Sequence, residues 1–555
     1  MFKGEALCES CRVLFVTKET PSRSIAGIAG IVAVATLISK VFGLVRQEVQ
    51  AAAFGLGPAA DAFNYAYTIP GFLLILLGGI NGPFYSAVVS VLAKRKQEEA
   101  APLVETITTL IGGILLIVAI FLAIFAPTFI DVFAPGLQLS HKDLVRGIAI
   151  RQLQIMAPMA VLAGLIGIGF GVLNAANQYW LPAVSPLFSN VAVIVGVGIL
   201  YLQVGNKIGV PDEHYATLGG MVLAGGYLAG AVLQWWVQIV AQTKAGLGTF
   251  RLRFNFNQPG VSDVIKIMLP ATFSSGMLQI NLYTDLFFAS LLPTTGVAAA
   301  LANASLLVQT PLGIISSVIL IPLLPIFSRL AAPENWPDLK LRIRQGLLLS
   351  AFTMLPLGAL MIALSVPIVR VVYERGAFSR SDSGLVASLL VANGIGMFAY
   401  LGRDVLVRVF YALGDGQTPF RISMINIFLN ALLDYFLIKP FGAPGLVLAT
   451  VGVNCGSVLM LLFLLNRRLN GLPWQEWSLP ILGLTAASMV GGVASFGILE
   501  VSQHFLGNNG LLIQLLQLCM AGFVGLCLFG AIAFWMNLPD VNVFISHLRQ
   551  RFLSR

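Results

Sequence analysis

The chain has 555 residues, of which 57% are hydrophobic and only 10% are charged. Soluble globular domains carry about 25% charged residues, so the composition excludes an ordinary soluble protein and indicates a membrane protein with many spans. The formal net charge of +9 is spread over separate loops and forms no basic stripe with interleaved aromatic residues. The charge pattern therefore predicts no nucleic-acid partner.

The first 23 residues are polar and basic. They contain no short apolar core followed by small residues, so we expect a cytoplasmic leader and no removable signal peptide. Cys8 and Cys11 in this leader form a single C-x-x-C pair with no second pair and no neighbouring histidine. An unstructured leader is therefore a stronger interpretation than a metal or redox site.

Apolar windows of about 20 residues, separated by glycine, proline and charges, predict fourteen membrane-spanning helices. They lie near 24–52, 59–93, 103–128, 143–175, 181–203, 215–242, 259–292, 296–329, 340–367, 382–412, 418–438, 442–466, 475–502 and 510–537. Pro70 in the second window and Pro311 in the eighth would interrupt backbone hydrogen bonds at mid-depth. The freed groups must then be satisfied by neighbouring helices or face a cavity.

Basic residues test the topology of these spans. With the amino terminus inside, most lysines and arginines of the loops lie on the cytoplasmic side. This bias is typical of cytoplasmic loops, and it predicts an even number of spans with both termini in the cytoplasm. We therefore expect a multi-pass membrane protein.

Two helix ends recur along the chain. Residues 132–136 resemble 372–376, and 172–175 with Pro182 resemble 409–412 with Pro419. The separation corresponds to six predicted helices, so both copies have the same orientation in the membrane. This predicts two pseudo-symmetric six-helix lobes with a binding site at their interface.

The predicted fold is an all-α polytopic membrane protein with about fourteen spans. Its parts are a leader (1–23), an amino-terminal lobe (24–242), a cytoplasmic linker (243–258), a carboxy-terminal lobe (259–466), two further helices (467–537) and a cytoplasmic tail (538–555). The linker is basic and aromatic, which is typical of a segment at the membrane surface.

Motifs of common enzymes are missing from the sequence. There is no P-loop, no G-x-S-x-G, no H-E-x-x-H and no paired-aspartate motif. The acidic clusters that would hold magnesium on a pyrophosphate are also missing. These observations favour a secondary transporter over an enzyme, with no cofactor.

The first span ends in a polar run. Lys40, Gly43 and Gln47 share one stripe at helical spacing, and Arg46 lies about a third of a turn away. Cations at membrane depth without neighbouring acids suit an anionic ligand such as a phosphate. Alternatively, Lys40 and Arg46 extend to the lipid headgroups. Asp61 opens the second helix, where an N-cap is a stronger interpretation than a ligand-binding role.

A second group of polar residues lies in the carboxy-terminal half. Asn430 and Asp434 share a face of the eleventh span, Thr450 lies on the twelfth and Asp285 on the seventh. Carboxylate, amide and hydroxyl oxygens are ligands for hard cations, so these four residues form a hypothetical monovalent cation site. The alternatives are a hydrogen-bond network with a protonated Asp434, or an Asp434 at the outer boundary near Lys439.

Three motifs follow in order along the chain. They are Ser39-Lys40-x-x-Gly43-x-x-Arg46 followed by 60–63, then 374–378, then Arg408-x-Phe410-Tyr411-Ala412-x-x-Asp415-x-x-Thr418-Pro419. In these residues the chain resembles the MurJ (MviN) family of bacterial lipid II flippases, within the multidrug/oligosaccharidyl-lipid/polysaccharide exporter superfamily. The resemblance covers about 24–537.

The resemblance implies two lobes in a V around a cationic cavity, and a hydrophobic groove formed with the last two helices. It implies alternating access that moves undecaprenyl-pyrophosphate-linked muropeptide, lipid II, from the inner to the outer leaflet for cell-wall synthesis. Lipid II and membrane lipids are the expected partners, the cell-wall synthesis machinery is a candidate partner, and the chain is expected to be a monomer. Sodium ion, proton or membrane potential would couple the transport.

The chain departs from the family pattern at several cavity positions. The family usually has Arg where Lys40 stands and Asp where Gln47 stands. Arginines often follow the second-helix proline and precede the eighth-helix proline, whereas 71–76 and 304–309 contain none. We therefore expect a less cationic cavity, in which Lys266, Arg403 or Arg408 compensates.

The sequence and the resemblance together assign seven residues to head-group binding. They are Lys40, Arg46, Gln47, Asp61, Asn81, Lys266 and Arg403. Two other functions stay open. The first is a sibling transporter of another lipid-linked oligosaccharide or of small drugs. The second is a non-transporting scaffold for cell-wall enzymes, which would tolerate neutral residues at positions 40 and 46.

Overall fold

The computed structural model describes residues 25–79, 82–92, 97–176, 178–205, 212–258, 260–277, 280–507 and 510–536. All regular structure in these ranges is helical. This confirms the all-α fold class that the long apolar windows predict.

The first half of the chain forms the helices up to α11. They are α1 (Ile25–Phe54), α2 (Pro58–Gly78), α3 (Pro83–Leu92), α4 (Gln97–Ile124), α5 (Ala126–Phe133), α6 (Gly136–Leu139), α7 (Asp143–Met156), α8 (Met159–Ala175), α9 (Trp180–Val184), α10 (Pro186–Val204) and α11 (Glu213–Lys244).

The second half forms the remaining helices. They are α12 (Val261–Met277), α13 (Ile280–Leu291), α14 (Val297–Arg329), the short 3-10 helix η2 (Pro333–Asn335), α15 (Trp336–Ala363), α16 (Ser365–Tyr373), α17 (Arg380–Ala412), α18 (Gln417–Phe441), α19 (Ala443–Arg468), α20 (Trp474–Leu506) and α21 (Leu511–Trp535).

Eleven spans within the described residues are long and apolar enough to cross a membrane, or twelve when the bent pair α7–α8 counts as one. This count includes neither α1 nor the α12–α13 pair, which correspond to the first and seventh predicted spans. The structure therefore confirms a helical multi-pass membrane protein, whereas the total of fourteen spans stays a prediction.

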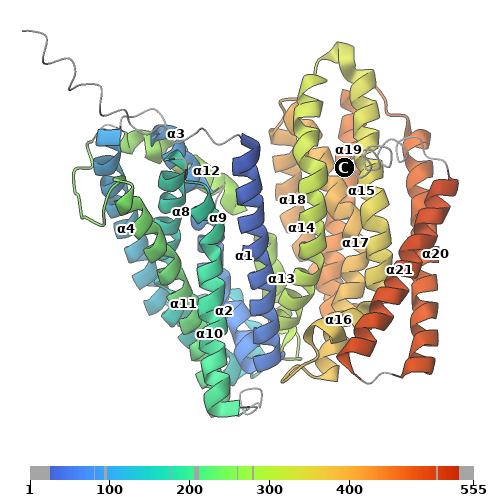
Figure 1. Cartoon of the computed structure of the whole chain (residues 1–555), viewed down its shortest axis with the longest axis horizontal. Coiled ribbons are helices and arrows are strands. Elements are labelled where there is room, and N and C mark those ends of the chain that lie inside the picture. Colours follow the sequence, from blue (N-terminus) through green and yellow to red (C-terminus); the bar gives the residue numbers. More distant parts are fainter. Residues whose placement is uncertain are drawn as a thin grey trace, which may run out of the picture.

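Two helix bundles stand side by side, each with its own apolar core (Figure 1). Met156 and Phe170 are fully buried in the first core, and Phe327 and Phe410 in the second. Helices α20 and α21 pack together at the far edge of the second bundle, where α20 also contacts α15 (Figure 1). The domain boundaries given by the sequence stay predictions.

Both bundles contain the same kind of broken helix. The long α4 is followed by the short α5, which ends at Phe133, and the long α15 is followed by the short α16, which ends at Tyr373. Both ends fall at the recurring junctions 132–136 and 372–376. The weak sequence similarity therefore marks equivalent turns in the two bundles.

The seventh predicted span is divided between the bundles. Val261 and Val264 of α12 belong to an apolar cluster with α3 and α4 of the first bundle, whereas α13 packs on α18 and α19 of the second. The sequence alone groups both halves with the second lobe, because apolar periodicity does not reveal which bundle receives an apolar face.

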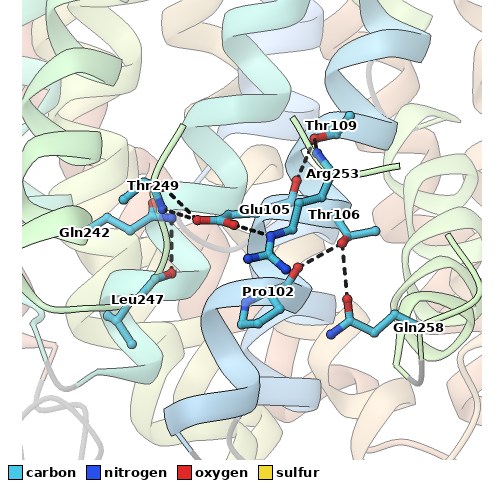
Figure 2. Close-up of polar contacts among 9 residues, drawn as sticks. All are labelled: Pro102, Glu105, Thr106, Thr109, Gln242, Leu247, Thr249, Arg253 and Gln258. Carbon is cyan, nitrogen blue, oxygen red and sulfur yellow. Dashed lines mark hydrogen bonds and ion pairs between the residues drawn. The ribbon is translucent and has the colours of Figure 1, made fainter. Parts of the chain in front are cut away.

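The linker between α11 and α12 is held against α4 by Glu105 (Figure 2). Glu105 Oε1 accepts hydrogen bonds from the backbone N–H and the hydroxyl of Thr249 at 2.9 and 2.8 Å, and Oε2 accepts one from Arg253 Nε at 2.6 Å. The hydroxyl of Thr109 accepts the backbone N–H of Arg253 at 3.0 Å. Because the Glu105 side chain is only 5% exposed, these donors are what makes its charge tolerable there.

The linker between α11 and α12 exposes apolar side chains at the protein surface. Phe250, Leu252, Phe254 and Phe256 alternate along it and are all exposed. This alternation fits the predicted membrane-surface position of the linker, which stays a prediction.

Replacing Glu105 with alanine should release the linker, because three hydrogen bonds lose their acceptor. Hydrogen bonds to a charged group contribute about 1.5–3 kcal/mol each, so we expect tryptic cleavage after Arg251 or Arg253 to accelerate at least about tenfold. Limited proteolysis of the purified protein, read by mass spectrometry, measures this rate. Thr243→Ala is the control, because the one hydrogen bond of its hydroxyl among the described residues goes to the carbonyl of Ile239 in its own helix. Equal cleavage rates in the parent and the Glu105 variant would contradict the clamp.

Asp415, from the third sequence motif, fixes the start of α18. Its Oδ1 accepts the backbone N–H of Thr418 at 3.0 Å, and its Oδ2 accepts the Thr418 hydroxyl at 2.7 Å and the Arg468 guanidinium at the end of α19. Burial by itself would raise the pKa of Asp415, but the hydrogen bonds from Thr418 and the charge of Arg468 outweigh it, so the pKa is lowered. The motif thus has a structural role at a helix start.

Asp415→Ala should lower the free energy of unfolding by about 1 kcal/mol at neutral pH. Because folding lowers the pKa of Asp415, its contribution is present above the unfolded pKa of about 4 and is lost as the pH falls through the folded pKa. The difference from the parent should therefore shrink at acidic pH. Thermal unfolding of the purified protein at several pH values measures it, with the exposed Asp338→Ala as control. A stability difference between the parent and Asp415→Ala that does not change with pH would contradict a role for the ionised Asp415 carboxylate.

Candidate functional site

Helix α1 runs without interruption through the polar end of the first predicted span. The residues that share a stripe in the sequence therefore share a face of one helix. Lys40 is exposed, and a Cβ built on Gly313 of α14 would lie 3.8 Å from its Nζ atom. The Lys40 amine thus lies between the two bundles, next to the second one.

Arg46 and Gln47 face opposite bundles. The Arg46 Nη1 atom donates to Asn190 Oδ1 at 3.1 Å, and its guanidinium lies 5.0 Å from the centroid of the Tyr227 ring. Gln47 instead donates from Nε2 to Oδ1 of Asn303 on α14 at 2.7 Å. The Arg46 Nε is buried and has no hydrogen-bond partner among the described residues, so it is a donor that an anion can satisfy.

Two adjoining cavities lie around these side chains. The first, called here the Arg46 cavity, has a volume of about 140 Å³ and is lined by Arg46, Gln47 and aromatic residues of α2 and α11. The second, the interlobe cavity, has a volume of about 450 Å³ and extends from Gln47 to Asp285 and Thr450 of the second bundle. Gln47, Asn64 and Tyr67 line both cavities. The two groups of polar residues found in the sequence therefore border one continuous region.

The structure brings the four predicted cation ligands together. Asn430 Nδ2 donates to Asp285 Oδ1 at 2.8 Å and to Asp434 Oδ2 at 3.0 Å. The Thr450 hydroxyl lies 3.3 Å from Asp285 Oδ2 and 3.3 Å from Asn430 Oδ1. Helices α13, α18 and α19 thus contribute to one cluster, although Asp285 and Thr450 are 165 residues apart in the chain.

Two carboxyl groups that share one amide nitrogen repel each other when both are ionised, so the cluster needs a bound cation or a proton. Asp434 Oδ1 is buried and has no hydrogen-bond partner among the described residues. The amide of Asn430 can turn to present its oxygen, and the cluster then offers carboxylate, amide and hydroxyl oxygens, which fit a hard cation. A protonated hydrogen-bond network remains the alternative.

The third interpretation placed Asp434 at the outer boundary near Lys439. Asp434 is fully buried, and the Lys439 amine lies 5.3 Å from the centroid of the Tyr435 ring. The structure therefore favours an interior position for Asp434, within the cluster with Asp285.

Asp61 does not cap its own helix, so that interpretation of the sequence is wrong. Helix α2 begins at Pro58, with Gly57 at the N-cap and no side-chain cap. Asp61 Oδ1 instead accepts the backbone N–H groups of Ala298 and Ala299 at 3.0 and 3.4 Å. The first amides of a helix lack partners inside the helix, so Asp61 satisfies two of them in α14 from the other bundle. It is fully buried and lines neither cavity, so in this conformation it does not reach a head group.

Lys142 is a second link between the bundles. Its Nζ donates to the carbonyls of Leu292 and Thr294, just after α13, at 2.6 and 3.0 Å. Burial lowers the pKa of Lys142, and the charge of Asp61 partly opposes this effect. In the sequence, Lys142 is a basic residue directly before the predicted span 143–175, and no pattern around it indicates this contact.

The second family motif supplies a third link. The backbone N–H of Ala377 donates to the carbonyl of Ala52 in α1 at 2.8 Å. Gly376 has φ +58°, and a Cβ there would lie 2.2 Å from the same carbonyl oxygen, so this approach requires glycine. Together with Asp61 and Lys142, this contact joins the bundles around the end of α1, called here the closed end.

Two further residues from the sequence assignment, Lys266 and Arg403, do not join this region. Lys266 is exposed on α12 and lines neither cavity. Arg403 donates to Asn454 and Ser423, at 3.4 Å each, within the second bundle. Neither is placed to compensate for missing cavity arginines in this conformation. Asn81 lies outside the described residues.

Sequence reasoning missed several partners of the α1 side chains. Gln50 Nε2 donates to the Tyr227 hydroxyl at 3.0 Å. Gln50 lies one helical turn after Arg46, so its spacing alone could have placed it on the same face as Arg46. Asn190 and Asn303 have no such local signal, because they come from other helices far along the chain.

Comparison with known proteins gives one consistent result. The family model described as "Lipid II flippase MurJ" matches residues 50–516. A curated protein from Synechocystis sp., named "Probable lipid II flippase MurJ", is 55% identical over 531 residues, which cover 96% of this chain and 98% of that protein. A solved structure of lipid II flippase MurJ in an inward closed conformation has a TM-score of 0.70 at 22% identity, and covers 94% of this chain and 99% of that chain.

A second solved structure belongs to a different transporter type. The inward-facing conformation of a multidrug resistance MATE family transporter has a TM-score of 0.60 at 13% identity, and covers 80% of this chain and 98% of that chain. At such low identities both structural matches show a shared fold.

Proposed function

This chain belongs to the MurJ family, and we propose that it moves lipid II from the inner to the outer leaflet of the bacterial cytoplasmic membrane. The observation that carries this proposal is the position of Lys40 and Arg46. Arg46 lines a cavity to which both bundles contribute. Lys40, on the same helix, lines neither cavity, but its amine lies against Gly313 of α14 in the second bundle. A side chain that extends only to the lipid headgroups would not lie there.

Arg46 and Lys40 suit the pyrophosphate of lipid II. The buried Arg46 Nε has no partner among the described residues and offers a charge-assisted hydrogen bond. The amides of Gln47 and Asn64 in the same region can hydrogen-bond neutral sugar and peptide groups. The apolar tail needs no such path and stays in the lipid or against α20 and α21.

Transport by alternating access requires the closed end to open. The links at Asp61, Lys142 and Ala377 all join the two bundles at the end of α1. With the amino terminus in the cytoplasm, this end faces outward, so the conformation described here accepts its substrate from the inner leaflet. Release outward then requires that these contacts separate.

The cluster of Asp285, Asn430, Asp434 and Thr450 is the proposed coupling site. It would hold a monovalent cation such as sodium, which supplies the positive charge that two adjacent carboxylates need. Because Asp285 and Thr450 line the same cavity as Gln47, occupancy of the cluster can influence the contact between the bundles. A proton at the same carboxylates is the second candidate.

Further properties belong to the same proposal. The chain acts as a monomer with both termini in the cytoplasm, performs no catalysis and supplies lipid II to the cell-wall synthesis machinery. These statements rest on the family and on the sequence.

A depletion experiment tests the function. A bacterial host whose own flippase is depleted receives this chain, and both growth and lipid II translocation are measured. We expect both to be restored. A well-expressed chain that restores neither would favour the sibling transporter or the scaffold.

A further inference from the structure

Three aromatic side chains form one wall of the Arg46 cavity. Phe63 and Tyr67, one turn apart on α2, stack with ring centroids 5.1 Å apart. Tyr227 of α11 completes the group, with its centroid 4.6 Å from that of Phe63 and 5.0 Å from that of Tyr67. The guanidinium of Arg46 lies 5.0 Å from the Tyr227 centroid, so the proposed phosphate donor and the aromatic wall are neighbours.

Tyr67 is the member of this wall that faces free space. It is only partly buried, and it lines both the Arg46 cavity and the interlobe cavity. Its hydroxyl forms no hydrogen bond with any described residue. The ring lies against Gly71, where a Cβ would lie 2.4 Å from the ring atom Cε1, so the glycine sets the position of the ring.

The chemistry of this wall restricts the ligand. An apolar chain would remove water from Gln47, Asn64 and the Tyr67 hydroxyl without replacing their hydrogen bonds. A cation would be repelled by Arg46, and the negative faces of aromatic rings do not attract an anion. A sugar ring satisfies both requirements, because it has a face of C–H groups for the aromatic wall and hydroxyl groups for the amides.

We propose that Tyr67, with Phe63 and Tyr227 behind it, forms a subsite for the sugar that is attached to the pyrophosphate. This inference rests on the proposed function. The cavity volume of about 140 Å³ is well below the roughly 300–1,000 Å³ of sites for drug-sized ligands, so one ring enters here and the rest of the head group occupies the interlobe cavity. Arg46 holds the pyrophosphate, and the sugar bonded to it lies against Tyr67.

Binding of two probes tests the subsite. The purified full chain in nanodiscs is titrated with undecaprenyl pyrophosphate and with undecaprenyl-pyrophosphate-N-acetylglucosamine, which adds one sugar and no peptide. We expect Tyr67→Leu to weaken binding of the sugar-bearing probe about tenfold, as for the loss of an aromatic contact and a hydrogen bond. Binding of the probe without sugar should not change. Arg46→Ala should weaken binding of both probes.

Two further variants sharpen the test. Tyr67→Phe keeps the ring and removes only the hydroxyl, so we expect a smaller loss that is again confined to the sugar-bearing probe. Tyr435→Leu removes an exposed tyrosine that lines neither cavity and should change neither affinity. If the tyrosine 67 variants weaken both probes equally, or neither, the sugar subsite is wrong while the pyrophosphate site stands. If the parent chain binds neither probe, the proposed function fails and the subsite fails with it.

Discussion

A chain that carries both Lys40→Ala and Arg46→Ala should lose transport of lipid II by about 100-fold or more. Hydrogen bonds to charged groups contribute about 1.5–3 kcal/mol each. Both cations lie on α1, where Arg46 lines the Arg46 cavity and the Lys40 amine faces Gly313 of the second bundle. The loss is measured as the amount of lipid II that reaches the outer leaflet in cells whose own flippase is depleted, compared with cells that carry the parent chain. Lys40→Arg should keep most of the activity, because the charge is retained.

The matched control for this variant is Lys439→Ala with Arg421→Ala. Both side chains belong to α18 and line neither cavity, so this pair removes the same charges elsewhere and should leave transport unchanged. Equal activity of the parent and the Lys40 and Arg46 double variant, at equal protein level, would disprove the cationic-cavity mechanism.

Asp285→Asn and Asp434→Asn should each abolish the dependence of transport on a coupling cation. Each variant removes one of the two negative charges that require a counter-charge, so the rate with the ion should fall to the rate without it. Transport in vesicles with and without a sodium gradient measures the ratio. A parallel series with a pH gradient distinguishes a proton from sodium.

Two comparisons make this experiment specific. Asp263→Asn changes an exposed aspartate on α12 and should leave the ion dependence intact. Thr450→Ala removes a neutral oxygen and should weaken the ion dependence without abolishing it. The cation site is excluded if both aspartate variants transport normally and the parent shows no ion dependence.

The sequence is sufficient for those parts of the fold that local patterns encode. Long apolar windows predict helices, and the junctions at 132–136 and 372–376 mark equivalent breaks after α4 and α15. The cluster of Asp285 and Asp434 could also be predicted from the sequence. Acidic residues inside apolar segments with no neighbouring base need partners on other helices.

The contacts that the sequence does not predict are those that depend on which helices pack against each other. Asp61 reads as an N-cap because it lies in the first turn of α2, yet its partners are amides of α14, more than 230 residues away. Lys142 reads as a loop cation because its carbonyl partners after α13 carry no sequence signal. The division of the seventh span between the bundles is of the same kind, since it depends on packing and not on periodicity.

Reconstituted vesicles provide the most direct measurement of the central claim. The purified chain is placed in proteoliposomes that contain labelled lipid II, and the fraction of lipid II that crosses between leaflets is followed over time. We predict rapid crossing with the parent chain, and crossing at the level of protein-free vesicles with the Lys40 and Arg46 double variant. A parent chain that moves lipid II no faster than protein-free vesicles would contradict this claim.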